Sequence, residues 1–208
     1  PGFKGEGITY RFVQFVKDGL DITAGNFYEQ FGSGLILRAY EERGLGYDNM
    51  FDGVRLIYEP IKGFKVKGII GRQRIYFANS PGIVRALDAS FSFNELFESL
   101  NNNPTRFTLG GSFVSKFQTA NDPFLNLPQN VGSGAVRLDI MGLKWGLNSE
   151  YVYKVNDPSS DNHYIFRPGQ SLMVNLTYNT KGFGALLGVK RVDNMSFRSD
   201  RNATTIEG

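Results

Sequence analysis

The chain has 208 residues, a formal net charge of +3, 25 glycines, 18 phenylalanines, 10 tyrosines and no cysteine. The missing cysteines exclude a disulfide framework and thiolate metal sites, and the dispersed basic residues argue against a nucleic-acid-binding surface. No apolar run approaches the roughly 20 residues of a membrane-spanning helix, but this test does not detect a transmembrane β-barrel, in which half of the residues face water.

Alternating apolar and polar residues predict a series of about ten antiparallel strands. The first, residues 8–16, places Ile8, Tyr10 and Phe12 on one face and ends at the Asp18-Gly19 turn, where positive φ is favoured. The other predicted strands cover residues 20–24, 54–59, 64–70, 86–94, 106–117, 136–141, 144–155, 171–179 and 183–192.

The lengths of the strands and of their connections favour one class of fold. Most predicted strands have about 9–12 residues, near the roughly 9–11 that a tilted membrane-spanning strand needs and above the usual 5–6. Short connections at 17–19, 60–63, 98–104, 142–143 and 179–182 alternate with long ones at 26–50, 119–132, 156–168 and 198–208, with 78–83 intermediate. This alternation is typical of outer-membrane barrels, which have short periplasmic turns and long external loops.

One strand face is rich in Phe, Leu, Val, Tyr and Trp, and the other mixes charged residues with Asn, Ser and Gly. We therefore predict an all-β fold, an antiparallel up-and-down transmembrane β-barrel formed by residues 1–208 as a single domain. The loop-like ends suggest a fragment of a longer chain and a larger barrel. A soluble β-sandwich binding module would show the same alternation and is the remote alternative. The barrel predicts a bacterial outer-membrane location, with lipid or lipopolysaccharide and other outer-membrane proteins as partners.

The long connection 25–49 contains the run GNFYEQFGSGLILRAYEERGLGYDN. This run resembles a motif of largely uncharacterised Bacteroidota outer-membrane β-barrel proteins, and the rest of the chain resembles them only in its strand pattern. The resemblance implies an outer-membrane barrel and a possible pore, without a substrate.

The same loop is the best candidate for a functional element. Gly32 and Gly34 allow sharp bends or a close approach to a wall, and the nearly balanced charges suit cross-links in a wet lumen. We expect a porin-like or channel-forming protein in which loop 26–50 is a constriction or plug, although an external loop with solvated charges fits the sequence equally well. A non-conducting structural or docking subunit of an outer-membrane complex is the alternative. The lumen or constriction candidates are Tyr28, Glu29, Arg38, Glu41, Glu42, Arg43, Arg55, Arg106 and Arg137.

No catalytic, cofactor or metal site is predicted. The single histidine, His163, lies on a predicted external loop, and neither a G-x-S-x-G nor an H-E-x-x-H motif is present. The spacing of the loop acids Asp157, Asp161 and Asp200 matches no defined calcium site, so we expect these carboxylates to be solvated. A basic excess among the lumen-facing residues would favour anionic solutes, unless these residues pair across strands.

Overall fold

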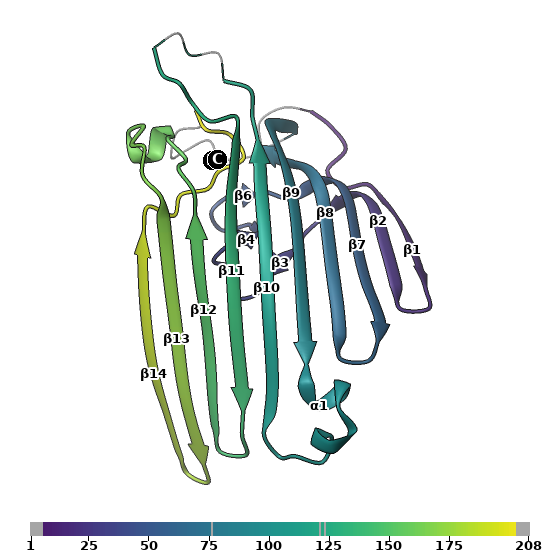
Figure 1. Cartoon of the computed structure of the whole chain (residues 1–208). Coiled ribbons are helices and arrows are strands. Elements are labelled where there is room, and N and C mark those ends of the chain that lie inside the picture. Colours follow the sequence, from purple (N-terminus) through teal and green to yellow (C-terminus); the bar gives the residue numbers. More distant parts are fainter. Residues whose placement is uncertain (1–5, 76, 121, 123, 203–208) are drawn as a thin grey trace.

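A computed structural model describes residues 6–75, 77–120, 122 and 124–202. Ten strands form one antiparallel sheet in which each strand pairs with the next along the chain (Figure 1). They are β1 Phe12–Lys17, β2 Leu20–Phe27, β7 Phe51–Ile61, β8 Phe64–Ile75, β9 Ala78–Ser92, β10 Arg106–Phe117, β11 Asn130–Met141, β12 Trp145–Lys154, β13 Gly169–Thr180 and β14 Phe183–Asp193. The predicted all-β class and the count of about ten strands are confirmed.

The sheet is not closed. In the described part of the chain β1 and β14 each have one neighbour and form its two edges. The helical segments are short: α1 Phe93–Leu96 and η1 Glu98–Leu100 lie between β9 and β10, and η2 Ser160–Asn162 lies between β12 and β13. None of the described helices is long and apolar enough to cross a membrane.

Several predicted strand bounds were wrong; for example, β11 begins at Asn130 and β8 ends at Ile75. Residues 78–83 are not a connection, because β9 begins at Ala78 and runs for 15 residues. Pro81 is tolerated there because β10 pairs with β9 only from Ile83 onward, so the missing N–H faces no partner on that side. The first strand was predicted over residues 8–16, but it begins at Phe12. Phe12 pairs with Gly25, and its side chain lies on the face opposite to that of Phe15.

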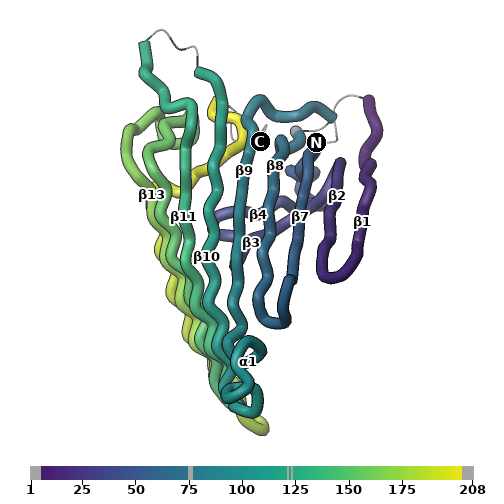
Figure 2. Tube along the Cα trace, turned by 45° about the vertical axis from the view of Figure 1, so that its right-hand side comes forward, coloured from purple at the N-terminus to yellow at the C-terminus, as the bar shows by residue number. Residues whose placement is uncertain are grey.

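The two faces of the sheet differ in composition and in what covers them. We call the face with Val54, Leu56 and Tyr58 the outer face; its side chains are exposed, and no second sheet covers it within the described residues. The opposite, inner face carries Arg55, and the segment between β2 and β7 lies across it, behind the sheet in Figures 1 and 2. A β-sandwich formed by these strands alone is therefore not observed.

Candidate functional site

The segment between β2 and β7 forms two small hairpins on the inner face (Figure 2). The first joins β3 Gln30–Phe31 to β4 Leu37–Arg38, and the second joins β5 Glu41–Glu42 to β6 Tyr47–Asp48. We call residues 28–50 the inner loop. Gly32, Gly34 and Gly46 have positive φ at its turns, at 53°, 87° and 65°.

Gly32 marks the closest approach of the inner loop to the sheet. A Cβ atom at this position would lie 2.6 Å from Oε2 of Glu150 on β12 and would also overlap the side chain of Arg137 on β11. A side chain at this position would have to displace the loop or the ends of these two side chains, and the positive φ of Gly32 also favours glycine. Gly32 thus allows a close approach to side chains of the sheet, whereas at Gly34 the nearest atoms belong to the inner loop itself.

A dry cluster seals the inner loop to the sheet. Phe31 and Leu37 of the loop are buried, together with Phe27 and Phe51 at the ends of the flanking strands. On the sheet side the cluster contains small and branched apolar residues of the inner face, namely Ile69, Val84, Ala86, Val114, Ala135 and Val152. The face that mixes charged residues with Asn, Ser and Gly thus also carries an apolar patch, at the place where the inner loop packs.

Beside this patch, buried polar residues of four strands, β9 to β12, lie under the first hairpin. Ser33 donates from its backbone N–H and its hydroxyl to the Glu150 carboxylate, at 2.7 and 2.6 Å. Arg137, directly opposite Glu150 in the sheet, forms an ion pair of 2.7 Å with Asp88 on β9 and also donates to Ser112 on β10. All four strand residues are at most 9% exposed, so these hydrogen bonds act where water cannot replace them.

Glu29 anchors the start of the inner loop to strands β7 and β8, on the same inner face. Its carboxylate accepts from Lys67 on β8 at 2.7 Å and lies 3.5 Å from Arg55 on β7. Arg55 also lies 3.6 Å from Asp21 and donates to the Thr23 hydroxyl on β2. The loop is therefore held by polar contacts at both sides of the dry cluster, from β7 to β12.

The second hairpin ends in a buried pair of charges. Asp48 accepts from the Tyr28 hydroxyl at 3.2 Å and from the Met50 backbone N–H, and it forms an ion pair with Arg74 of β8. Burial, followed by the neighbouring Asp48 carboxylate, raises the pKa of the Tyr28 hydroxyl. Tyr28, Asp48 and Arg74 line a pocket of about 260 Å³, with Tyr10 from the segment before β1.

Most of the predicted lumen residues take part in the contacts of the inner loop. Tyr28, Glu29, Arg55 and Arg137 lie in the contacts just described, and the Arg38 guanidinium lies 4.3 Å from the centre of the Tyr40 ring.

The remaining candidates are solvent-exposed. Glu41 pairs with the exposed Arg43 at 3.2 Å, and Glu42 accepts from the Gly44 N–H. Arg106 begins β10 at the short-turn end of the sheet, opposite Met141, and lies outside these contacts.

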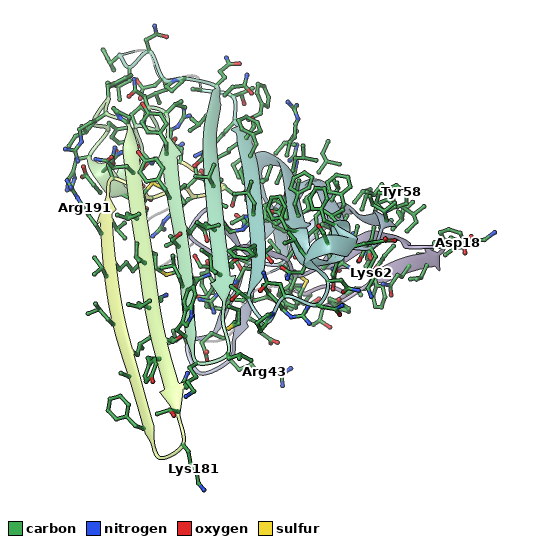
Figure 3. All side chains as sticks on the ribbon, turned by 60° about the horizontal axis from the view of Figure 1, so that its bottom comes forward. Asp18, Arg43, Tyr58, Lys62, Lys181 and Arg191 are labelled. Atoms are coloured by element: carbon green, nitrogen blue, oxygen red, sulfur yellow. The ribbon has the colours of Figure 1, made fainter. Side chains whose placement is uncertain are left out.

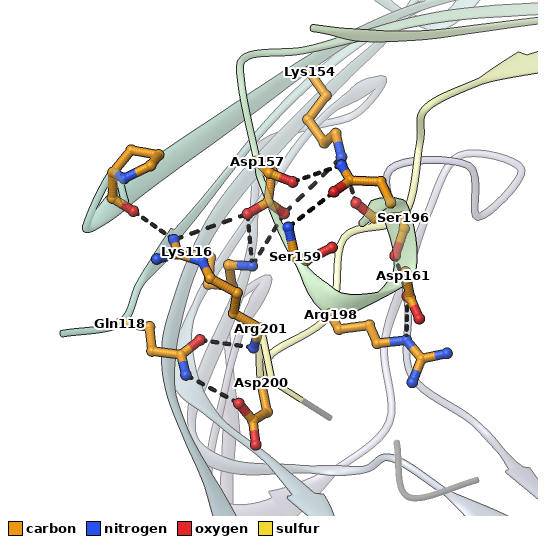
Figure 4. Close-up of polar contacts among 12 residues, drawn as sticks. Lys116, Gln118, Lys154, Asp157, Ser159, Asp161, Ser196, Arg198, Asp200 and Arg201 are labelled. Atoms are coloured by element: carbon orange, nitrogen blue, oxygen red, sulfur yellow. Dashed lines mark hydrogen bonds and ion pairs between the residues drawn. The ribbon is translucent and has the colours of Figure 1, made fainter. Parts of the chain in front are cut away.

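A second polar cluster fixes the segment after β14 to the long-loop end (Figure 4). Asp157 is fully buried and lies 3.1 Å from Lys116, 4.0 Å from Lys154 and 3.9 Å from Arg201. Nearby, Asp161 pairs with Arg198 at 2.6 Å, and Asp200 accepts from Gln118 at 3.0 Å. The expectation that Asp157, Asp161 and Asp200 are solvated loop charges was therefore wrong, since residues 194–202 fold back against the long-loop end of the sheet.

Sequence reasoning missed Ser33, Asp48 and Arg74 as contact residues. Ser33 lies between two glycines, which is a signal for close approach, but nothing in the sequence identifies Glu150 as its partner. His163 is exposed at the end of η2, where it has a φ of 54°. Among the described residues no three His, Cys, Asp or Glu side chains come together as the ligands of a metal ion would.

The comparisons with known proteins give a family and nothing closer. No curated protein and no solved structure matches the chain. A family model matches residues 1–208, which is the full length of this chain. The chain therefore belongs to a family of unknown function (DUF6029).

Proposed function

We propose that this sheet is part of the wall of a bacterial outer-membrane β-barrel of the porin-like or channel-forming kind, and that the inner loop narrows its lumen. In this arrangement the outer face contacts lipid and the inner face lines the water-filled interior. The observation that carries the proposal is the contrast between the faces of one sheet. The outer face is apolar and uncovered, whereas the inner face is charged and carries the loop.

The outer face has the composition of a lipid-facing surface. Along the middle of the strands it exposes aliphatic and aromatic side chains, including Leu56, Ile70, Leu87, Leu109, Phe113, Val136, Leu138, Leu172, Leu176, Leu187 and Val189. Soluble monomers normally expose apolar patches of only a few hundred Å², whereas these residues extend over seven strands. Contact with hydrocarbon would remove this surface from water.

Aromatic residues gather at the short-turn end of the outer face. Phe64 and Phe91 stack at 4.7 Å between ring centres, and Tyr178 lies 6.4 Å from Phe183. Tyr58 and Trp145 are exposed at the same end of β7 and β12. Such a belt is typical of the membrane–water interface, where rings with a polar edge are favoured.

The open edges favour a larger barrel. An unpaired strand edge leaves N–H and C=O groups without partners, which lipid does not tolerate. Leu186 and Leu187 point to opposite faces of β14, and both are more than 60% exposed. A barrel with further strands would pair both edges and give β14 a lumen side.

A non-conducting docking subunit is the second candidate, and the dry cluster under the inner loop favours it. A loop sealed by Phe31 and Leu37 and held by Ser33 and Glu29 closes off that half of the inner face permanently. If the rest of the lumen were filled in the same way, the barrel would anchor partners without passing solute.

Planar-bilayer recordings of the reconstituted protein test the proposal. We expect ion conductance that increases when residues 28–50 are replaced by a short turn. A double variant, Glu41→Gln with Glu42→Gln, should shift ion selectivity towards anions without disturbing the buried contacts. The control variant Asp18→Asn, at the turn between β1 and β2, should leave ion selectivity unchanged. Absence of conductance in the wild type and in both loop variants would overturn the channel and favour the docking subunit. A monomeric, cooperatively folded protein in detergent-free buffer would overturn the barrel itself.

A further inference from the structure

The outer face changes from apolar to basic near the long-loop end of strands β7 to β9. Ile70 on β8 is followed on the same face by Arg72, and Leu87 on β9 is preceded by Arg85. Arg72 pairs with Ile83 and Arg85 pairs with Ile70, so the two arginines are diagonal neighbours across adjacent strands. Diagonal neighbours have Cα atoms roughly 7–8 Å apart, within the reach of two guanidinium groups for one ligand.

Around these two arginines, basic side chains outnumber acidic ones. Asp52 on β7 lies opposite Arg72, but its carboxylate already accepts from Arg11 at 3.2 Å and from Asn79 at 3.3 Å. Within the described part of the chain, no ion pair is formed by Arg72 or Arg85. The group of Arg11, Arg72, Arg85 and Asp52 therefore has a net charge of +2, and its three arginines are exposed.

The opposite end of the outer face has a different kind of basic residue. Lys62, Lys144 and Lys181 lie at the short turns, and Figure 3 shows Lys181 at the tip of the β13–β14 turn with Arg191 towards the other end of β14. Lysine presents a hydrated point charge, whereas the planar guanidinium of arginine binds two phosphate oxygens at once. The long-loop end is thus the end suited to phosphate.

We propose that Arg72 and Arg85, with Arg11 beside them, bind the phosphate of an anionic lipid headgroup. The inference rests on the proposed membrane location, because it places the arginines where the lipid-facing surface meets the headgroups. The apolar residues directly below, Ile70 and Leu87, would contact the acyl chains of the same lipid, so one site accommodates both parts of the molecule.

Titration of the detergent-solubilised full chain with dihexanoyl phosphatidic acid, followed by native mass spectrometry, tests this site. Dihexanoyl phosphatidylcholine serves as the zwitterionic lipid, and inorganic phosphate as the ligand without acyl chains. The double variant Arg72→Gln with Arg85→Gln should weaken phosphatidic acid binding roughly thirty-fold, since each basic side chain near an anionic headgroup contributes about a factor of five. Arg72→Lys with Arg85→Lys keeps the charge and should give an intermediate loss. Lys144→Gln with Lys181→Gln, at the short-turn end, is the matched control and should change little.

The outcomes separate this inference from the proposed function. Equal loss in the short-turn control, or equal binding by wild type and the glutamine variant, would overturn the site while leaving the barrel intact. Binding of inorganic phosphate as tight as that of phosphatidic acid would overturn its assignment to lipid. Failure of the wild type to associate even with phosphatidylcholine vesicles would instead count against the membrane location.

Discussion

Strands β10 to β12 and strands β13 to β14 lie in one sheet with the same alternation. The inner face is largely buried on the first group, whereas on the second group it is mostly half-buried or exposed, with buried exceptions such as Ser171. Val114, Ala135 and Val152 on the first group are at most 6% exposed, because the inner loop covers them. On β14 every residue from Phe183 to Val192 is exposed, whichever face it occupies. The alternation of a strand therefore decides which residues share a face, and the inner loop decides which part of that face is dry.

The comparison also separates two kinds of polar residue on the inner face. Under the loop, Asp88, Arg137 and Glu150 are buried and specific in their partners. On β13 the inner positions carry short uncharged polar groups such as Asn175 and Thr177, which are only partly buried. Variants in the two regions should accordingly differ in their effect on stability.

The largest expected effect is that of Phe31→Ala, which removes a fully buried ring from the dry cluster. We expect it to lower the free energy of unfolding by about 3–5 kcal/mol, because the cavity adds to the lost apolar burial. Phe183→Ala on β14 is the matched control, since Phe183 is 60% exposed and contacts no cluster of buried residues. Denaturant unfolding in detergent micelles measures both. Equal losses would show that the loop contributes no core of its own.

Asp88→Asn should have the next largest effect. It leaves the buried Arg137 without its carboxylate partner, and hydrogen bonds between charged groups contribute about 1.5–3 kcal/mol. We expect a loss of about 2–3 kcal/mol in the same unfolding experiment. Asp18→Asn, at an exposed turn with only a 4.0 Å contact to Lys17, should have little effect. A small effect at position 88 would indicate that water reaches this part of the inner face.

Ser33→Ala should have a smaller effect confined to the loop. It removes the hydroxyl that donates to Glu150 at 2.6 Å but keeps the backbone donor at 2.7 Å, so about 1–2 kcal/mol should be lost. Hydrogen exchange should show faster opening of residues 30–38 with little change in β13 and β14. Ser149→Ala removes a hydroxyl bonded to the Leu138 carbonyl on the exposed face and serves as the control. Uniform acceleration over the whole sheet would contradict a loop anchored at this point.

Much of the sheet could be predicted because each strand carries its own signal. Period-two alternation locates strands such as 106–117, and Asp18-Gly19 identifies a hairpin turn through its positive φ. The prediction failed at 78–83, where Pro81 suggested a break although its missing N–H needs no partner.

The contacts of the inner loop were less predictable because they join residues far apart in the chain. Ser33 and Glu150 are 117 positions apart, and the sequence contains no signal that pairs them. The same holds for Asp157, which looks like a solvated loop acid until Lys116 and Arg201 are brought to it by the fold. Local pattern therefore predicts the elements, while charges brought together by tertiary packing need the structure.

The smallest expected effect is a dependence of stability on pH that comes from Tyr28 in the inner loop. Burial and Asp48 raise the pKa of Tyr28 in the folded protein above its ordinary value near 10. The folded state thus holds this proton more tightly than the unfolded state, so the contribution is fully present below about pH 10 and is lost as the pH rises above it. Tyr28→Phe should reduce the fall in melting temperature between about pH 9 and pH 11. An identical alkaline slope in the wild type and in Tyr28→Phe would mean that the Tyr28 hydroxyl is not held by Asp48 in solution.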